Sequence, residues 1–87
     1  MPDTAAAQRA NMVAAQLRPN DVTDSRLRDA MLATPRERFV PASFAPVAYM
    51  ERCIPLGPGR VLLDPRSFAK LLQLASIGPG DRVLDVA

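Results

Sequence analysis

Proline constrains this chain more than any other residue type, because nine of the 87 residues are proline. A proline holds its own backbone angle, donates no amide hydrogen bond and keeps the preceding residue out of the helical region. The prolines therefore break the chain into short elements. Apolar spacing between them predicts helices over residues 4–18, 24–33 and 65–76, with short helical turns after Thr34 and within residues 41–50.

Polar residues at the expected helix starts support this division. Thr23 or Asp24 is the candidate N-cap of the second helix, because a short side-chain oxygen can accept a bond from a free amide of the first turn. Asp64 followed by proline predicts the start of the last helix. The run Thr34-Pro35-Arg36-Glu37 predicts a further start, with Thr34 as N-cap and Glu37 closing a capping box.

Apolar residues predict which parts of these elements are buried. One face of the first helix carries Ala6, Val13 and Leu17, with Met12 and Gln16 nearby. The last helix has a stripe of Phe68, Leu71, Leu72 and Ala75. The run Phe39-Val40-Pro41 is expected to insert into the core as an apolar plug. Tyr49 is expected to be a core aromatic with a tip exposed to water, and the alternative is that it offers its hydroxyl to the pocket.

The helical period is lost between residues 52 and 63, where Ile54-Pro55-Leu56-Gly57-Pro58-Gly59 predicts a short extended piece and a turn. After the last helix, Gly78-Pro79-Gly80-Asp81 predicts a tight turn and residues 82–86 a strand ending in Asp85. This order matches the opening of an α/β nucleotide-type domain, in which ligands bind beyond the carboxyl ends of the strands.

A single strand of this kind cannot form a sheet, because its backbone groups and apolar side chains would lie uncovered. The predicted fold class is therefore α/β: an N-terminal helical extension followed by the first strand of a doubly wound, Rossmann-like sheet. We expect the N-terminal part of a longer protein. The alternative is a truncation whose last strand pairs with another edge or stays frayed.

Several site chemistries are excluded by composition. The chain has no histidine and one cysteine, so it contains no Ser-His-Asp triad, no Cys-His pair, no internal disulfide and no structural zinc site. A lone cysteine fits a reducing compartment and predicts a cytoplasmic protein. We expect Cys53 to be a small buried apolar side chain.

The distribution of charge does not predict a nucleic-acid partner, and the lengths of the apolar stretches do not predict a membrane protein. Eleven basic and nine acidic residues give a net charge of +2, and no run of like charges forms a basic patch. The densest basic spot, Arg36-Glu37-Arg38, is expected to be a solvated face. No apolar stretch is long enough to span a bilayer, and the N-terminus lacks the pattern of a secretory signal.

From about residue 9 onward the chain resembles the protein-L-isoaspartate O-methyltransferase family. The resemblance is carried, in order, by Met12-Val13-Ala14-Ala15-Gln16-Leu17-Arg18, Val22-Thr23-Asp24-Ser25-Arg26, Ala30-Met31, Thr34-Pro35-Arg36-Glu37-Arg38-Phe39-Val40-Pro41, Ala48-Tyr49, Ile54-Pro55-Leu56-Gly57 and Pro79-Gly80-Asp81-Arg82-Val83-Leu84-Asp85-Val86. The segment containing Pro35 to Pro41 is fairly specific to this family, whereas the strand ending in Asp85 is general among methyltransferases.

The resemblance implies a doubly wound domain that uses S-adenosylmethionine as methyl donor. The implied acceptor is the carboxylate of an isoaspartyl residue in a damaged protein, and the resulting methyl ester collapses to a succinimide that allows repair. Residues 1–76 would form the N-terminal extension and substrate-side loop, and residues 77–87 the start of the methyltransferase domain. The glycine-rich cofactor loop would follow Ala87.

One segment departs from the family pattern. Where the family usually carries Thr-Ile-Ser-Gln-Pro, this chain reads Val61-Leu62-Leu63-Asp64-Pro65, so Leu63 stands at the serine position. A leucine cannot donate a hydrogen bond to a carboxylate, and Asp64 would repel an anionic acceptor.

The candidate catalytic positions are therefore Leu63, Asp64 and Arg60, the last because its charge could attract an acceptor carboxylate. Asp64 has the alternative role of a helix cap. Asp85 is the candidate cofactor-side residue. A protein of different class also fits the sequence, namely a non-catalytic helical interaction module of related ancestry.

Overall fold

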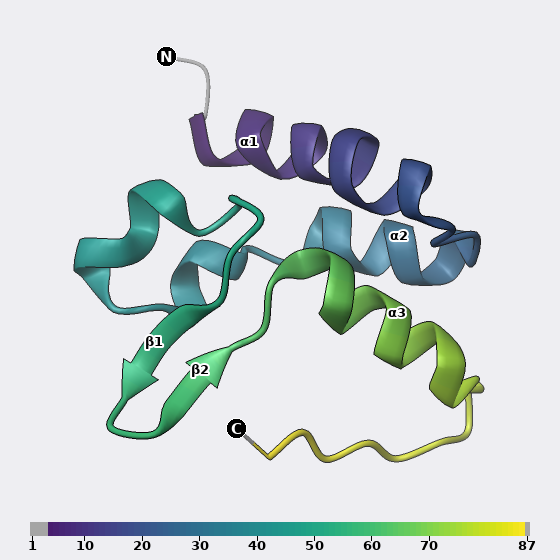
Figure 1. Cartoon of the computed structure of the whole chain (residues 1–87). Coiled ribbons are helices and arrows are strands. Elements are labelled where there is room, and N and C mark those ends of the chain that lie inside the picture. Colours follow the sequence, from purple (N-terminus) through teal and green to yellow (C-terminus); the bar gives the residue numbers. More distant parts are fainter. Residues whose placement is uncertain (1–3, 87) are drawn as a thin grey trace.

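The computed structural model describes residues 4–86, and helix α1 (Thr4–Met12) is their first element (Figure 1). The helix continues as a π-helical turn over Val13–Leu17 and a 3-10 turn over Arg18–Asn20. Because Pro19 has no amide N–H, the turn before it is not held in α register, and the Arg18 amide donates instead to the Val13 carbonyl. The predicted helix over residues 4–18 is thus confirmed as one helical segment with a widened end.

The core lies on the predicted face of this first segment. Met12, Val13 and Leu17 are buried, and they form one cluster with Val22, Ala48, Tyr49 and Ala69. The partly buried residues Ala5, Leu27, Met31 and Val40 pack against this cluster.

Helix α2 (Ser25–Ala33) begins as expected at Asp24, whose carboxylate accepts a hydrogen bond from the Arg26 amide at 3.0 Å. The predicted capping box after it is wrong. Thr34 donates through its hydroxyl to the Ala30 carbonyl at 2.7 Å, so it closes the end of α2. The next 3-10 turn, Arg36–Phe39, has no side-chain cap, because its N-cap residue Pro35 has no polar side chain. Glu37 bonds to Tyr49 and Arg9 and so does not close a box with Thr34.

The apolar plug is confirmed only in part. Val40 packs against the core, whereas Phe39 is 63% exposed and lines a groove that is open to solvent. The further turn expected within residues 41–50 is a 3-10 helix over Ala42–Val47.

The segment between residues 52 and 63 forms a hairpin of β1 (Ile54–Gly57) and β2 (Arg60–Leu62). The two strands are antiparallel, and Gly59 in the connecting turn adopts a left-handed φ of 73° that favours glycine. Ile54 anchors the hairpin in the interior. Cys53, directly before it, is exposed, so the expectation of a buried cysteine is wrong.

Helix α3 (Pro65–Ala75) follows the hairpin and begins at Asp64, as predicted. Its expected stripe is only half covered. Of the predicted stripe, Phe68 and Leu72 are half-buried, whereas Leu71 and Ala75 are exposed. Outside the stripe, Ala69 is fully buried and Leu74 is 81% exposed.

After α3 the chain makes the expected turn, in which the Asp81 amide donates to the Gly78 carbonyl at 3.1 Å. It then runs back toward the hairpin without regular structure (Figure 1). The predicted strand over residues 82–86 is therefore not formed, because no strand edge in the described part of the chain pairs with it. The described residues form a mixture of helices with a short two-stranded sheet. Within residues 4–86 no helix is long and apolar enough to cross a bilayer.

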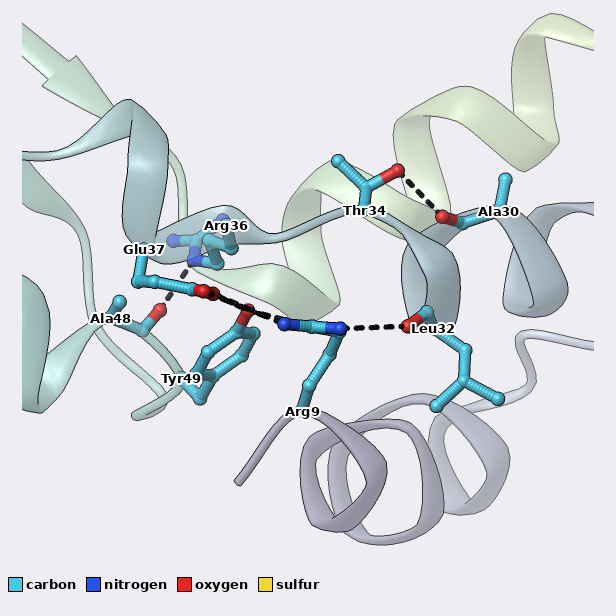
Figure 2. A network of polar contacts seen from close by, with 8 residues as sticks. All are labelled: Arg9, Ala30, Leu32, Thr34, Arg36, Glu37, Ala48 and Tyr49. Carbon is cyan, nitrogen blue, oxygen red and sulfur yellow. Dashed lines mark hydrogen bonds and ion pairs between the residues drawn. The ribbon is translucent and has the colours of Figure 1, made fainter. Parts of the chain in front are cut away.

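A polar network joins α1 to the 3-10 turn Arg36–Phe39 and to the chain just after the 3-10 helix Ala42–Val47 (Figure 2). The buried Tyr49 donates its hydroxyl proton to Glu37, and Arg9 Nε donates to the Tyr49 oxygen at 2.9 Å. Arg9 also pairs with Glu37 at 3.4 Å. Tyr49 is thus a core aromatic as expected, but its tip is not exposed to water, because its hydroxyl bonds to Glu37 and Arg9 and 6% of the residue is exposed.

A second link ties α3 to the loop before α2 through one amide side chain. Gln73 accepts hydrogen bonds from the Thr23 and Asp24 amides at 2.8 and 3.0 Å, and donates to the Asp21 carbonyl at 2.8 Å. All three partners are backbone groups of one loop, so Gln73 fixes where that loop meets α3.

We expect Gln73→Ala to lower the free energy of unfolding by about 1–2 kcal/mol, because it leaves three backbone groups without their partner. Urea denaturation of the protein measures the change. Leu74→Ala is the matched control, since Leu74 is the neighbouring, exposed side chain on the same helix. Equal losses in the two variants would contradict this role for Gln73.

The Glu37 network makes stability depend on pH. Burial raises the pKa of Glu37, but the bonds from Tyr49 and Arg9 outweigh it and hold that pKa below its usual range. The stabilisation is therefore complete above the ordinary glutamate pKa of about 4.3, and is lost as the pH falls through the lowered pKa of the folded protein.

We accordingly expect Glu37→Gln to be less stable than the natural protein at pH 7, with a difference that narrows as the pH falls below about 4. Denaturant unfolding at a series of pH values tests this. Glu51→Gln, which makes the same change at an exposed position, is the matched control. A Glu37→Gln difference that is constant from neutral to acid pH would rule out the charged pair as its source.

Candidate functional site

A groove with a volume of about 370 Å³ lies between the helices and the hairpin. Most of its lining is apolar, including Met31 from α2, Leu62 from β2, and Phe68 and Leu72 from α3. Its polar lining residues are Thr34, Arg36 and Asp85. An apolar groove with a few convergent polar groups is typical of small-molecule and peptide sites. This groove is therefore the candidate functional site.

Arg36 is the most buried charged residue at the groove, with 8% of its surface exposed. Its Nε donates to the Ala48 carbonyl at 2.5 Å (Figure 2), and an Nη donates to the Leu63 carbonyl at 2.7 Å. No carboxylate in the described part of the chain lies within ion-pair distance of it. Burial lowers the pKa of Arg36, and this is opposed by the more distant charge of Asp64. A guanidinium remains charged despite such a shift.

The expectation that residues 36–38 form a solvated face is thus wrong for Arg36. Arg38, two residues later, is exposed as expected, and Glu37 is half-buried. The two arginines differ because only Arg36 points at backbone carbonyls from other elements. Sequence reasoning missed Arg36 as a site residue, because a short charged run carries no signal that distinguishes its members.

Asp64 caps α3 through a carboxylate that accepts from the Ser67 amide at 3.0 Å. Burial raises its pKa, but the bonds from Ser67 outweigh burial and hold the pKa below its usual range. The exposed Cys53 thiol lies 4.0 Å from the other carboxylate oxygen. Asp64 is therefore an anion fixed beside the groove, with one oxygen committed to the helix.

Leu63 lies between the groove residue Leu62 and the cap Asp64. Its side chain is half-buried and its carbonyl is held by Arg36. The segment from Leu62 to Asp64 is thus fixed at both ends, by the hairpin on one side and by the cap of α3 on the other.

The two remaining predicted residues are placed differently. Asp85 is exposed and lines the groove, so the chain end returns to the segment around Leu63. Arg60 is exposed on β2 and is not among the residues that line the groove. Of the four predicted positions, only Asp85 lines the groove, whereas Leu63 and Asp64 directly follow the lining residue Leu62 in the sequence and Arg60 lies outside it.

Within residues 4–86 no group of three or more His, Cys, Asp and Glu is placed to hold a metal ion. The polar groups that line the groove are an arginine, one carboxylate and a hydroxyl, which can bind or orient polar parts of a ligand.

Comparison with known proteins shows which family the chain resembles in sequence. The profile of the family described as Protein-L-isoaspartate(D-aspartate) O-methyltransferase matches residues 7–87. A Protein-L-isoaspartate O-methyltransferase from Methylorubrum extorquens (strain PA1) is 41% identical over 86 residues, which are 99% of this chain and 37% of that protein.

Two further relatives of the same name give similar figures. The protein from Koribacter versatilis (strain Ellin345) is 40% identical over 81 residues, 93% of this chain and 36% of the relative. The protein from Pectobacterium carotovorum subsp. carotovorum (strain PC1) is 39% identical over 79 residues, 91% of this chain and 38% of the relative. The chain thus spans 36–38% of the length of these relatives. On the strength of a profile that covers nearly all of its residues, the chain belongs to the protein-L-isoaspartate O-methyltransferase family.

Proposed function

We propose that this chain is the N-terminal part of an S-adenosylmethionine-dependent methyltransferase that acts on the carboxylate of isoaspartyl residues in damaged proteins. Membership of the family over residues 7–87 is the observation that carries the proposal. In this proposal residues 1–76 form the substrate-side extension and residues 77–87 begin the cofactor domain. Residues 82–86 become the first strand of its doubly wound sheet once a neighbouring strand is present.

The residues around the groove have defined tasks in this function. When bound, S-adenosylmethionine supplies a methyl group that a carboxylate oxygen of the acceptor attacks. The apolar lining from β2 and α3 excludes water around the acceptor side chain, which strengthens polar interactions there. Leu63 lies where the family serine would donate a hydrogen bond to the acceptor. Arg60, on the exposed hairpin, would attract the acceptor from outside the groove.

The residues present fit only part of a cofactor site. Asp85 offers one carboxylate at the groove, next to mainly apolar side chains. A nucleoside carrying a charged amino-acid tail requires several convergent polar groups. Residues 4–86 therefore supply one edge of the site, and the proposal assigns the remaining contacts to the cofactor domain.

We expect the 87-residue chain by itself to bind S-adenosylmethionine with a Kd weaker than about 1 mM. Isothermal titration calorimetry on the isolated chain tests this, with the natural full-length protein as the comparison. Micromolar binding by the isolated chain would show that the cofactor site is complete within these residues, and would contradict the proposed division.

We expect Leu63→Ser to raise the isoaspartyl methylation rate of the full-length protein about 10- to 100-fold, because a hydrogen bond to a charged group is worth about 1.5–3 kcal/mol. Transfer of a radiolabelled methyl group to an isoaspartyl peptide measures the rate. Val61→Ser is the control, since it also introduces a serine on the same segment, at an exposed position.

Strong methylation by the natural protein, unchanged by Leu63→Ser, would show that no hydroxyl is needed there. Absence of methyl transfer from both the natural protein and Leu63→Ser would favour the second candidate, a non-catalytic helical interaction module. The exposed Leu71 and Leu74 on α3 are the observation on its side, because apolar residues on one helix can bind a partner.

A further inference from the structure

The burial of the Arg36 guanidinium costs free energy, because a cation is removed from water. This cost is offset only when the N–H donors are hydrogen-bonded, and a nearby carboxylate usually contributes to the offset. Here 8% of the residue is exposed and no described carboxylate lies within ion-pair distance. Its direct hydrogen bonds go to two backbone carbonyls, those of Ala48 and Leu63, and the more distant charge of Asp64 also favours the cation.

These two carbonyls belong to different parts of the chain. Ala48 follows the 3-10 helix Ala42–Val47, next to the core residue Tyr49, and Leu63 lies between β2 and α3. The Tyr49 carbonyl is itself held by the Gln16 side-chain amide at 2.6 Å, so the Ala48 side of the contact is anchored to the first helical segment. Arg36 therefore links the Leu63 peptide to a part of the backbone that is anchored in the core.

The Leu63 peptide is the part of the chain whose position matters most at the groove. Leu62 on one side lines the groove, and Asp64 on the other is committed to the cap of α3. A small displacement of a reacting group costs much of the rate in methyl transfer, as in any reaction that depends on orientation. The guanidinium that holds this peptide also lines the groove itself.

From this geometry we infer that Arg36 is a positioning residue, which sets the place of Leu63 and Asp64 against the methyl acceptor by holding the Leu63 and Ala48 carbonyls together. The inference deepens the proposed function and rests on it for its kinetic consequence. A lysine cannot replace this arginine, because its ammonium is a point charge on a flexible stem and lacks the planar fork that reaches two acceptors.

The test uses the full-length protein with Arg36→Lys and Arg36→Met, and with Arg38→Lys and Arg38→Met as matched controls. Arg38 is an exposed arginine on the same 3-10 turn. Each variant is assayed well below its own melting temperature for kcat and KM with an isoaspartyl peptide and with S-adenosylmethionine. Hydrogen exchange over residues 62–67 is measured on the same samples. All kinetic assays are repeated with Leu63→Ser added, which supplies a readout if the natural rate is low.

We expect both Arg36 variants to lower kcat/KM for the peptide at least about tenfold. KM for S-adenosylmethionine should stay within about twofold, because the contact positions the acceptor side. Amide exchange over residues 62–67 should become faster in both Arg36 variants. The Arg38 variants should resemble the natural protein in every measurement. If Arg36→Met does not fold, Arg36→Lys, which keeps the charge and the stem, decides the matter.

The inference is overturned if Arg36→Lys leaves the peptide kcat/KM unchanged, or if the two substrates are affected equally, which would indicate a general loss of structure. Unchanged exchange over residues 62–67 also overturns it. If no isoaspartyl methylation is found even with Leu63→Ser, the proposed function fails separately. The exchange measurement then decides alone whether Arg36 positions this segment.

Discussion

Ala48 and Tyr49 form the backbone stretch on which the other described elements converge through hydrogen bonds and apolar contacts. The Ala48 carbonyl accepts from Arg36, the Tyr49 carbonyl accepts from Gln16, and the Tyr49 hydroxyl bonds to Glu37 and Arg9. Both residues are also buried in the apolar cluster. Polar and apolar contacts therefore converge on one short stretch of backbone. Because few aromatics are available for the core, this convergence does much of the work of fixing the elements relative to one another.

The Ala48–Tyr49 stretch also connects the core to the candidate site. Arg36 reaches from the Ala48 carbonyl to the Leu63 carbonyl, and the Leu63 peptide leads directly into the cap of α3. The groove thus lies against a part of the molecule that hydrogen bonds from several elements hold in place. In the proposed function, this support would hold the acceptor carboxylate in line with the methyl group. In the same proposal, Leu63 changes the side chain offered at the family serine position and leaves the backbone contacts around it in place.

The C-terminal segment, in contrast, has few contacts that hold it against the rest of the described structure. Val83, Leu84 and Val86 are exposed, and the backbone around them pairs with no strand in the described part of the chain. Leu71 and Leu74 on α3 are exposed as well. A strand exists only with a partner edge, so its sequence pattern predicts a tendency that neighbouring strands must complete. The helices and the short extended piece with its turn were therefore predictable from the sequence, the pairing of β1 and β2 into a hairpin was not predicted, and the doubly wound sheet remains a prediction.

By itself the sequence determined the elements whose causes are local. Asp24 and Asp64 cap α2 and α3 because their acceptors bond to amides two and three residues away, and proline widened the end of the first helical segment through its own missing N–H. The family resemblance was also carried by the residues alone.

Only the tertiary structure decided the fate of side chains whose partners are far along the chain. Arg36 and Arg38 look alike in the sequence, but Arg36 meets carbonyls 12 and 27 residues away and is buried, while Arg38 stays exposed. Glu37 likewise bonds to Tyr49 and Arg9, which are far from it in the sequence, and does not form the expected capping box. A local pattern states which bonds a side chain can make, whereas packing determines which partner arrives and how much water is left to compete with it.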